Sequence, residues 1–232
     1  MLVEPEVTRS FVVDAVAFDL DGTLLDTIHD IATAVNVLLV EEHLAPLPKD
    51  AVRDLVGKGM HNLLSRALAL RGAPPRDDAS MAQLLTRYQV HYASVLGRET
   101  VAYPGVMFAL DQLRGRGFKL AVVTNKASRF VRPHLEHAGM ADYFAAVVGG
   151  DDAVAKKPDA APVLLAAQQL GVAPARMLMV GDSANDVDAA RAAGSPVLAV
   201  PYGYNEGRSV QSFAADGIVD SLADLPAWVR RD

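Results

Sequence analysis

The sequence predicts an α/β protein in which a doubly wound parallel sheet carries an inserted helical cap domain. From residue 101 onward, short apolar runs alternate with segments of helical periodicity, which indicates strands joined by crossover helices. Between the first apolar run and residue 100 the periodicity is helical throughout. We therefore expect residues 1–25 and 101–232 to form the α/β core and residues 26–100 to form the cap.

The first predicted strand is the apolar run from Phe11 to Phe18, which leads directly into Asp-Leu-Asp-Gly-Thr at residues 19–23. Parallel sheets bind ligands at the carboxyl ends of their strands. Two carboxylates one residue apart are unfavourable there unless a cation lies between them or one of them holds a proton. The backbone amides of Gly22 and Thr23 suit a phosphate oxygen. An ordinary acidic turn is the alternative.

Three apolar stripes at helical spacing predict that the cap is a small helical bundle. Proline or glycine interrupts the pattern at residues 46–48, 57–59 and 72–75. The stripes consist of Ile31, Val35, Leu38 and Leu39; Met60, Leu63, Leu64, Ala67 and Leu68; and Leu85, Tyr88, Tyr92 and Val95.

The remaining strands of the core are short and apolar, as expected for strands buried on both faces. Helical patterns separate them, and two of these helices are expected to end at Gly171 and Gly194. The predicted strands are Leu120–Val123, Ala146–Val148, Met177–Val180 and Val197–Val200.

Polar groups follow these strands at the same edge of the sheet as Asp19. A Thr124-Asn125-Lys126 segment follows the second strand, although polar residues are common at such places. Of the two adjacent lysines before Pro158, we favour Lys157 as the inward cation, because proline fixes the neighbouring backbone.

A third acidic cluster follows the strand that ends at Val180. It contains Asp182 and Asp186 within the segment Gly-Asp-Ser-Ala-Asn-Asp. Helix capping by Asp182 or Ser183 is the simpler explanation for this segment. However, capping needs fewer acidic groups than the segment supplies.

Composition narrows the function. The chain has 232 residues, no cysteine and a formal net charge of −6. The length suits a sizeable core, and the absence of cysteine excludes disulfides and thiolate chemistry. The acidic balance argues against a general nucleic-acid or membrane surface, and no signal peptide or membrane span is evident. We expect a cytoplasmic monomer or homodimer with a loose N-terminal tail.

The four polar clusters, in this order, resemble the motifs of the haloacid dehalogenase superfamily over the whole chain. The resemblance implies a Rossmann-like core with a helical cap of the family's first type. It also implies that Asp19 attacks phosphorus to form an aspartyl phosphate, while Asp21 protonates the leaving oxygen and then activates water. Thr124, Asn125 and Lys157 would hold the phosphoryl oxygens.

The same resemblance implies a metal site. Asp19, Asp182 and the backbone carbonyl of Asp21 would bind a cation, and Asp186 would orient Lys157 or a metal-bound water. Mg²⁺ fits best because every expected ligand is an oxygen. Formally, the two charges of Mg²⁺ and the one charge of Lys157 balance the three carboxylates of Asp19, Asp21 and Asp182.

Several stretches further resemble bacterial phosphoglycolate phosphatases, among them the cap loop Gly57-Lys58-Gly59 and Tyr202-Gly203-Tyr204. We therefore expect a phosphatase for a small phosphate ester, with 2-phosphoglycolate as the favoured substrate. Lys58 and His61 could reach the carboxylate of the leaving group, or could simply be solvated. The alternatives are a phosphatase for another small ester, a phosphomutase acting on a sugar phosphate, and a catalytically idle binding protein.

Overall fold

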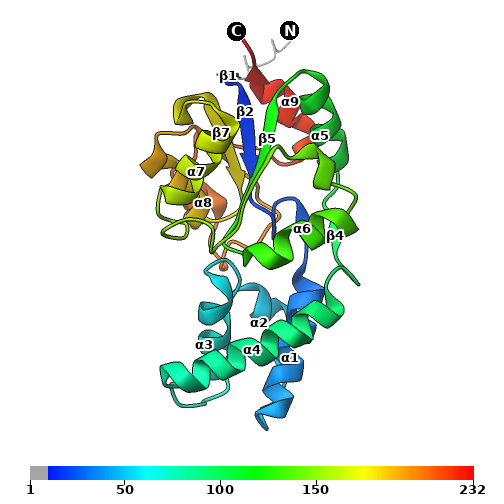
Figure 1. Ribbon diagram of the computed structural model, residues 1–232, viewed down its shortest axis with the longest axis vertical. Coiled ribbons are helices and arrows are strands. Elements are labelled where there is room, and N and C mark those ends of the chain that lie inside the picture. The colour runs from blue at the N-terminus through cyan, green and yellow to red at the C-terminus, as the bar shows by residue number, and fades with distance from the viewer. Residues whose placement is uncertain (1–9) are drawn as a thin grey trace, which may run out of the picture.

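The computed structural model describes residues 10–232, and it confirms the predicted fold class. Six parallel strands form one sheet in the order β6-β5-β2-β7-β8-β9, with β2 in the interior (Figure 1). The chain order reverses on the two sides of β2, so the sheet is doubly wound. The strands are β2 (Ala15–Phe18), β5 (Lys119–Val123), β6 (Ala146–Val148), β7 (Met177–Gly181), β8 (Val197–Ala199) and β9 (Gly217–Ile218).

The first predicted strand proves to be two strands, which corrects the single run from Phe11 to Phe18. β1 (Phe11–Val12) pairs in parallel with β10 (Val229–Arg230) in a separate two-stranded sheet, and only β2 enters the main sheet. The chain changes partners at Asp14, whose amide donates to the carbonyl of Arg176 at 2.8 Å. The expected loose tail falls on residues 1–9, which lie outside the described part of the chain.

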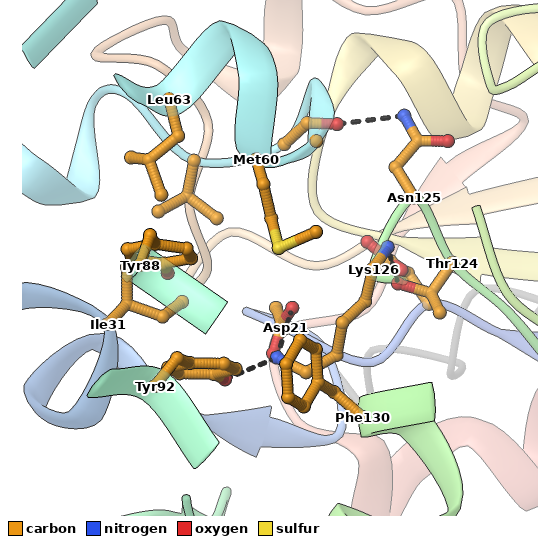
Figure 2. A pocket seen from close by; sticks show the side chains of 14 residues that line it. Asp21, Ile31, Met60, Leu63, Tyr88, Tyr92, Thr124, Asn125, Lys126 and Phe130 are labelled. Atoms are coloured by element: carbon orange, nitrogen blue, oxygen red, sulfur yellow. Dashed lines mark hydrogen bonds and ion pairs between the residues drawn. The ribbon is translucent and has the colours of Figure 1, made fainter. Parts of the chain in front are cut away.

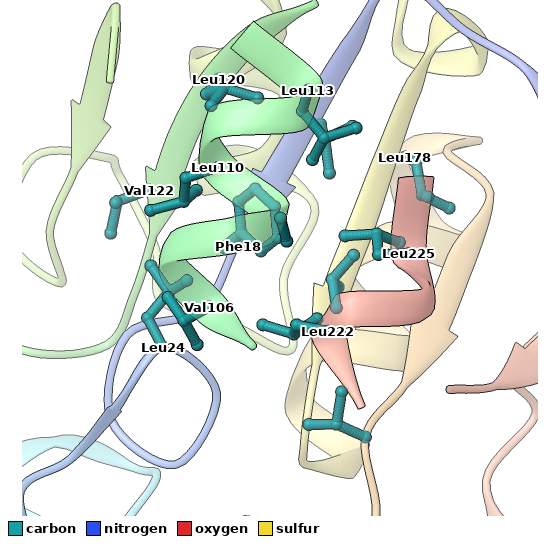
Figure 3. Packing of buried hydrophobic residues seen from close by; sticks show 14 of the residues in the cluster. Phe18, Leu24, Val106, Leu110, Leu113, Leu120, Val122, Leu178, Leu222 and Leu225 are labelled. Atoms are coloured by element: carbon teal, nitrogen blue, oxygen red, sulfur yellow. The ribbon is translucent and has the colours of Figure 1, made fainter. Parts of the chain in front are cut away.

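The two faces of the main sheet bury different side chains, as the alternation along a strand requires. Val16 and Phe18 point to one face, which α5 (Val106–Gly115), α6 (Ser128–His137) and α9 (Leu225–Trp228) cover. Figure 3 shows Phe18 in the same cluster as Leu110 of α5 and Leu225 of α9. Ala15 and Ala17 point to the other face, under α7 (Ala161–Leu170) and α8 (Ala184–Ala193). α7 packs mainly against β5 and β6, and α8 mainly against β7 and β8.

Four helices form the cap, at the end of the molecule opposite to β1 and β10 (Figure 1). They pack around a separate apolar cluster that also takes in Phe130 and Tyr204 from the core. The third predicted stripe is shifted: Met81 and Leu84 are buried with the two tyrosines, whereas Leu85 and Val95 are half-buried. The helices are α1 (Ile28–Glu41), α2 (Lys49–Arg53), α3 (Gly59–Leu70) and α4 (Asp78–Val95).

A short antiparallel ribbon joins the cap to the core. Its strands are β3 (Leu25–Asp26), which leads into α1, and β4 (Val101–Ala102), which follows α4. Buried Asp30 of α1 anchors the segment between α4 and β4. Its carboxylate accepts hydrogen bonds from the Gly97 amide at 2.8 Å, the Glu99 amide at 3.0 Å and the Thr100 hydroxyl at 2.8 Å.

None of the helices in residues 10–232 combines the length and hydrophobicity that a membrane span requires.

Candidate active site

Three neighbouring strands deliver the predicted site residues to one edge of the sheet. Asp19 follows β2, Thr124 follows β5 and Asp182 follows β7, and β2 is hydrogen-bonded to both of the other strands. Thr124 and Asp182 are buried, and the Asp19 side chain is only 13% exposed. The convergence expected from the strand order is therefore observed.

Asp19, Asp182 and Asp186 form a carboxylate cluster whose candidate ligand oxygens all lie within 4.8 Å of one another. Lys157 neutralises part of it: the Nζ atom lies 3.0 Å from Asp19 and 2.6 Å from Asp186, and it also donates to the Val123 carbonyl at 2.6 Å. Of the two adjacent lysines, Lys157 is the buried one, as expected.

The N-terminus of α8 explains how Asp186 is held. Ser183 is the N-cap, and the Asp186 carboxylate accepts from the Ser183 amide at 3.0 Å and from its hydroxyl at 2.6 Å. The other Asp186 oxygen faces Lys157. Because Ser183 performs the capping, Asp182 is left to the cluster, where Thr23 Oγ1 at 2.6 Å and the Tyr204 amide at 2.5 Å donate to it.

Burial makes this cluster electrostatically costly. Burial raises the pKa of Asp19 to about 6, even though Lys157 lowers it, and burial together with the charges of Asp19 and Asp186 raises the pKa of Asp182. The pKa of Lys157 is also raised, because the two carboxylates outweigh the opposing effect of burial. The arrangement therefore favours an added cation.

Asp21 lies apart from the cluster, although only one residue separates it from Asp19. Its carboxylate accepts from Lys126 Nζ at 2.9 and 3.0 Å and from Thr27 Oγ1 at 2.8 Å. Burial would raise the pKa of Asp21, but the Lys126 ammonium outweighs it and lowers the pKa below its usual range. The two carboxylates thus have separate partners and opposite pKa shifts.

The amides of Gly22 and Thr23 do not form the expected phosphate nest. The Gly22 amide donates to the Leu25 carbonyl at 2.9 Å, and the Thr23 amide donates to the Leu20 carbonyl at 3.3 Å. The tight turn satisfies its own donors, as buried backbone must. Gly22 is needed instead for space, because it has φ +93° and a Cβ atom there would collide with the Asp182 carboxylate.

The Asn125 side chain, expected at the phosphoryl group, is occupied by protein partners. Its amide nitrogen donates to the Gly57 carbonyl of the cap at 2.8 Å and to the Lys157 carbonyl at 2.9 Å, and its oxygen accepts from the Lys157 amide at 2.9 Å. Asn125 therefore positions the cap loop and Lys157. The Thr124 hydroxyl accepts from the Lys126 amide at 3.3 Å and keeps its own hydrogen for donation.

The cap loop reaches the site through its glycines and not through Lys58. Gly57 and Gly59 line the cavity beside Asp19 and Asp21. The Lys58 side chain pairs instead with Glu206 of the core at 2.9 Å and is 45% exposed. His61 is exposed and borders a different hollow, between α3 and α4. Neither residue lies where the expected contact with a leaving group would place it.

The cavity between cap and core is small, with a volume of about 60 Å³. Figure 2 shows Asp21 at its core side, with Lys126 extending beside Phe130 to Tyr92 of the cap. The sequence pattern predicted that Lys126 lies at this edge of the sheet but indicated no function for it. Tyr92 was predicted only as a core residue of the cap. The acidic pair at residues 19 and 21 was the available signal, since a second carboxylate calls for a second cation.

Comparison with known proteins fits this geometry. The sequence model of the haloacid dehalogenase-like hydrolases matches residues 16–200. The chain belongs to this family. The hydrolase is 47% identical over 221 residues to the phosphoglycolate phosphatase of Nitrosospira multiformis, covering 94% of this chain and 96% of that protein. It is 39% identical over 226 residues to the phosphoglycolate phosphatase of Escherichia coli K12, covering 90% of each.

A solved structure agrees with these relatives. The crystal structure of a predicted phosphoglycolate phosphatase from Haemophilus somnus superposes on the hydrolase with a TM-score of 0.87 and 31% identity, covering 92% of this chain and 96% of that one. The hydrolase is a phosphatase that acts on a phosphate monoester, as the motifs led us to expect.

The residues of the hydrolase also suit a divalent cation. Around the site, the carboxylates of Asp19, Asp21, Asp182 and Asp186 face two ammonium groups, those of Lys126 and Lys157. The formal charge is therefore −2 before substrate binds, which one divalent cation would balance. All candidate ligand atoms are oxygens, the donors that hard cations prefer.

Proposed function

We propose that this hydrolase is a Mg²⁺-dependent phosphatase that converts 2-phosphoglycolate to glycolate and phosphate through an aspartyl phosphate on Asp19. The observation that carries the proposal is the position of Asp19, at the end of interior strand β2 with Lys157 3.0 Å away. The relatives named phosphoglycolate phosphatase support this substrate, and the small cavity suits a short leaving group.

In this proposal the Mg²⁺ ion binds to the carboxylates of Asp19 and Asp182 and to the backbone carbonyl of Asp21. Asp186 supports the site indirectly, because Lys157 and Ser183 already occupy its two oxygens. When bound, the cation offsets the negative charge that would otherwise keep a phosphate monoester away from a carboxylate.

The protein side chains then divide the reaction between them. An Asp19 oxygen attacks phosphorus, while Lys157 and the Thr124 hydroxyl bind the phosphoryl oxygens. The Asp21 carboxyl donates a proton to the leaving oxygen as its bond to phosphorus breaks, and it later takes a proton from the water that hydrolyses the aspartyl phosphate. Asp21 can serve a different function from Asp19 because its carboxylate lies outside the cluster.

Phosphate release from 2-phosphoglycolate, measured with Mg²⁺ and with a chelator, tests the proposal. We expect turnover that is abolished by chelation and by Asp19→Asn. In a rapidly quenched reaction, mass spectrometry should find the phosphoryl group on Asp19. A phosphoryl group on another residue, or full turnover without metal, would overturn the mechanism. A phosphoenzyme that persists in water and passes its phosphate to a sugar would instead identify a mutase.

A further inference from the structure

The cavity above Asp21 contains a single cation. Among residues 10–232, Lys126 is the only lysine or arginine that lines it. The cap contributes mainly apolar groups, and Figure 2 shows them opposite Lys126. A group that leaves with the ester oxygen would therefore meet one ammonium within apolar walls formed by Ile31, Val56, Met60, Leu63 and Phe130.

Lys126 is fixed in position and removed from solvent. Its side chain is 5% exposed, and Nζ contacts both Asp21 oxygens at 2.9 and 3.0 Å and the Tyr92 hydroxyl at 2.5 Å. The ammonium also lies 4.8 Å from the centre of the Tyr92 ring. The Asp21 carboxylate balances this charge until Asp21 carries the proton for the leaving oxygen. The desolvated, immobilised ammonium then attracts an anion much more strongly than an exposed lysine does.

Tyr92 offers a second donor at the same place. Its hydroxyl oxygen accepts from Lys126, and within the described chain its own hydrogen has no acceptor. Burial raises the pKa of Tyr92 well above the usual range, so the hydroxyl keeps that hydrogen. Tyr88 stacks on the ring at 5.7 Å and holds it in place. A ligand group in the cavity would thus meet an ammonium and an unused O–H donor side by side.

The position of Lys126 relative to Asp21 matches one class of leaving group. In a 2-phospho carboxylic acid, only one carbon separates the ester oxygen from the carboxylate. The group that protonates the ester oxygen and the group that binds the carboxylate must therefore be neighbours. Asp21 and Lys126 are in direct contact. The cavity volume of about 60 Å³ favours a short leaving group over a bulky one.

We propose that Lys126, supported by Tyr92, binds the carboxylate of the leaving group and makes this site specific for short 2-phospho carboxylic acids. The inference rests on the proposed phosphatase mechanism and deepens it. Lys58 and His61, the cap residues that the sequence offered for this role, lie outside the cavity.

Three substrates of nearly equal size test the inference: 2-phosphoglycolate, 2-hydroxyethyl phosphate and phosphoethanolamine. They carry an anionic, a neutral and a cationic group, respectively, at the same position. The variant is Lys126→Met, which keeps an unbranched side chain one atom shorter and removes its charge. The matched control is Lys58→Met, which removes a lysine outside the cavity. Thermal melting and Mg²⁺ affinity verify that each variant is folded and binds metal.

We expect Lys126→Met to lower kcat/KM for 2-phosphoglycolate on the order of 100-fold more than for 2-hydroxyethyl phosphate. Activity on phosphoethanolamine should fall least, or rise, because the variant no longer repels its ammonium. Tyr92→Phe should shift the same ratio in the same direction by about 10-fold, the worth of one hydrogen bond to a charged group. Lys58→Met should leave the ratio unchanged.

An equal loss on all three substrates would overturn the inference, because Lys126 would then act only on Asp21. A shift of the ratio by Lys58→Met would also overturn it. Failure of the proposed substrate looks different. If the wild type prefers another 2-phospho acid, such as 2-phospholactate, and Lys126→Met removes that preference, the subsite stands and only 2-phosphoglycolate is wrong.

Discussion

Asp19 and Asp21 show how far one intervening residue can separate two carboxylates. Asp19 joins a buried acidic cluster that raises its pKa to about 6, whereas Asp21 turns toward Lys126, which lowers its pKa. Asp19 is placed to attack phosphorus by its position beside Lys157 at the end of β2, and Asp21 is placed to exchange protons with the leaving oxygen because its carboxylate lies outside the cluster.

Asp21→Asn should slow phosphate release from 2-phosphoglycolate by about 10²- to 10⁴-fold, because the variant cannot donate a proton to the leaving oxygen. The loss should be much smaller with p-nitrophenyl phosphate, whose leaving group departs without a proton. Steady-state kinetics on the two substrates make the comparison. Equal losses on both would remove the general-acid role from Asp21.

The metal-free protein should lose stability as pH rises, through the buried cluster. The folded-state pKa values of Asp19 and Asp182 are raised, so the folded protein binds protons that the unfolded chain has released. The stabilisation is complete below the ordinary value of 3.8 and is lost as pH rises through about 6. Asp21, with its lowered pKa, acts in the opposite sense only below 3.8.

Urea unfolding in chelator at pH 5 and at pH 8 measures this effect. Asp182→Asn should flatten the pH dependence by removing one of the two raised carboxyl groups. Saturating Mg²⁺ should stabilise the wild type more at pH 8 than at pH 5, because it binds the ionised cluster. If the free energy of unfolding of Asp182→Asn depends on pH as strongly as that of the wild type, the carboxylate cluster does not cause the pH dependence.

At the scale of elements, hydrogen bonds to Asp30 join α1 to the segment that leads into β4, and so connect the start of the cap to its end. Asp30→Ala would leave the buried Gly97 amide, the Glu99 amide and the Thr100 hydroxyl without the Asp30 acceptor. We expect the free energy of unfolding to fall by about 3 kcal/mol, as measured in urea. Asp30→Asn keeps one acceptor oxygen and should lose less. If the two variants are equally stable, the carboxylate does not anchor this segment.

The longer strands of the core were predictable from the sequence, because a short apolar run marks each of them. The apolar runs identified β5, β6, β7 and β8, and parallel pairing then brought Asp19, Thr124 and Asp182 together. The two-residue strands β3, β4, β9 and β10 were not predicted, because two residues are too few to show a pattern. The change of sheet between β1 and β2 was not predicted, because the residues on both sides of Asp14 are apolar and resemble one continuous strand.

Contacts between distant segments were not predictable. The Asn125 amide looked available until Gly57 and the Lys157 backbone were placed against it. Lys126 similarly meets Tyr92, which lies 34 residues earlier in the chain, only once α4 has docked. Periodicity indicates which side of a helix is buried. The segment that the helix packs against depends on tertiary docking.

For the whole molecule, the contact of cap and core includes a latch, which we define as the ion pair of Lys58 and Glu206. Because this pair is exposed and screened by salt, Glu206→Gln should change kcat/KM by less than about 3-fold, and equally for charged and uncharged substrates. Lys58→Met should do the same. A loss above 10-fold that is confined to 2-phosphoglycolate would return Lys58 to the leaving group.

The β3–β4 ribbon makes the cap a contiguous insertion that begins and ends at one place in the core. Leu25 lies opposite Ala102 and Asp26 opposite Val101, so the chain leaves the core and returns to it at adjacent positions. A tight hairpin turn could close this gap directly, so a different cap can be attached at the same point without a change in the strand order of the sheet. In such a layout, lineages could vary their choice of substrate by replacing one contiguous insert while inheriting the reaction chemistry unchanged.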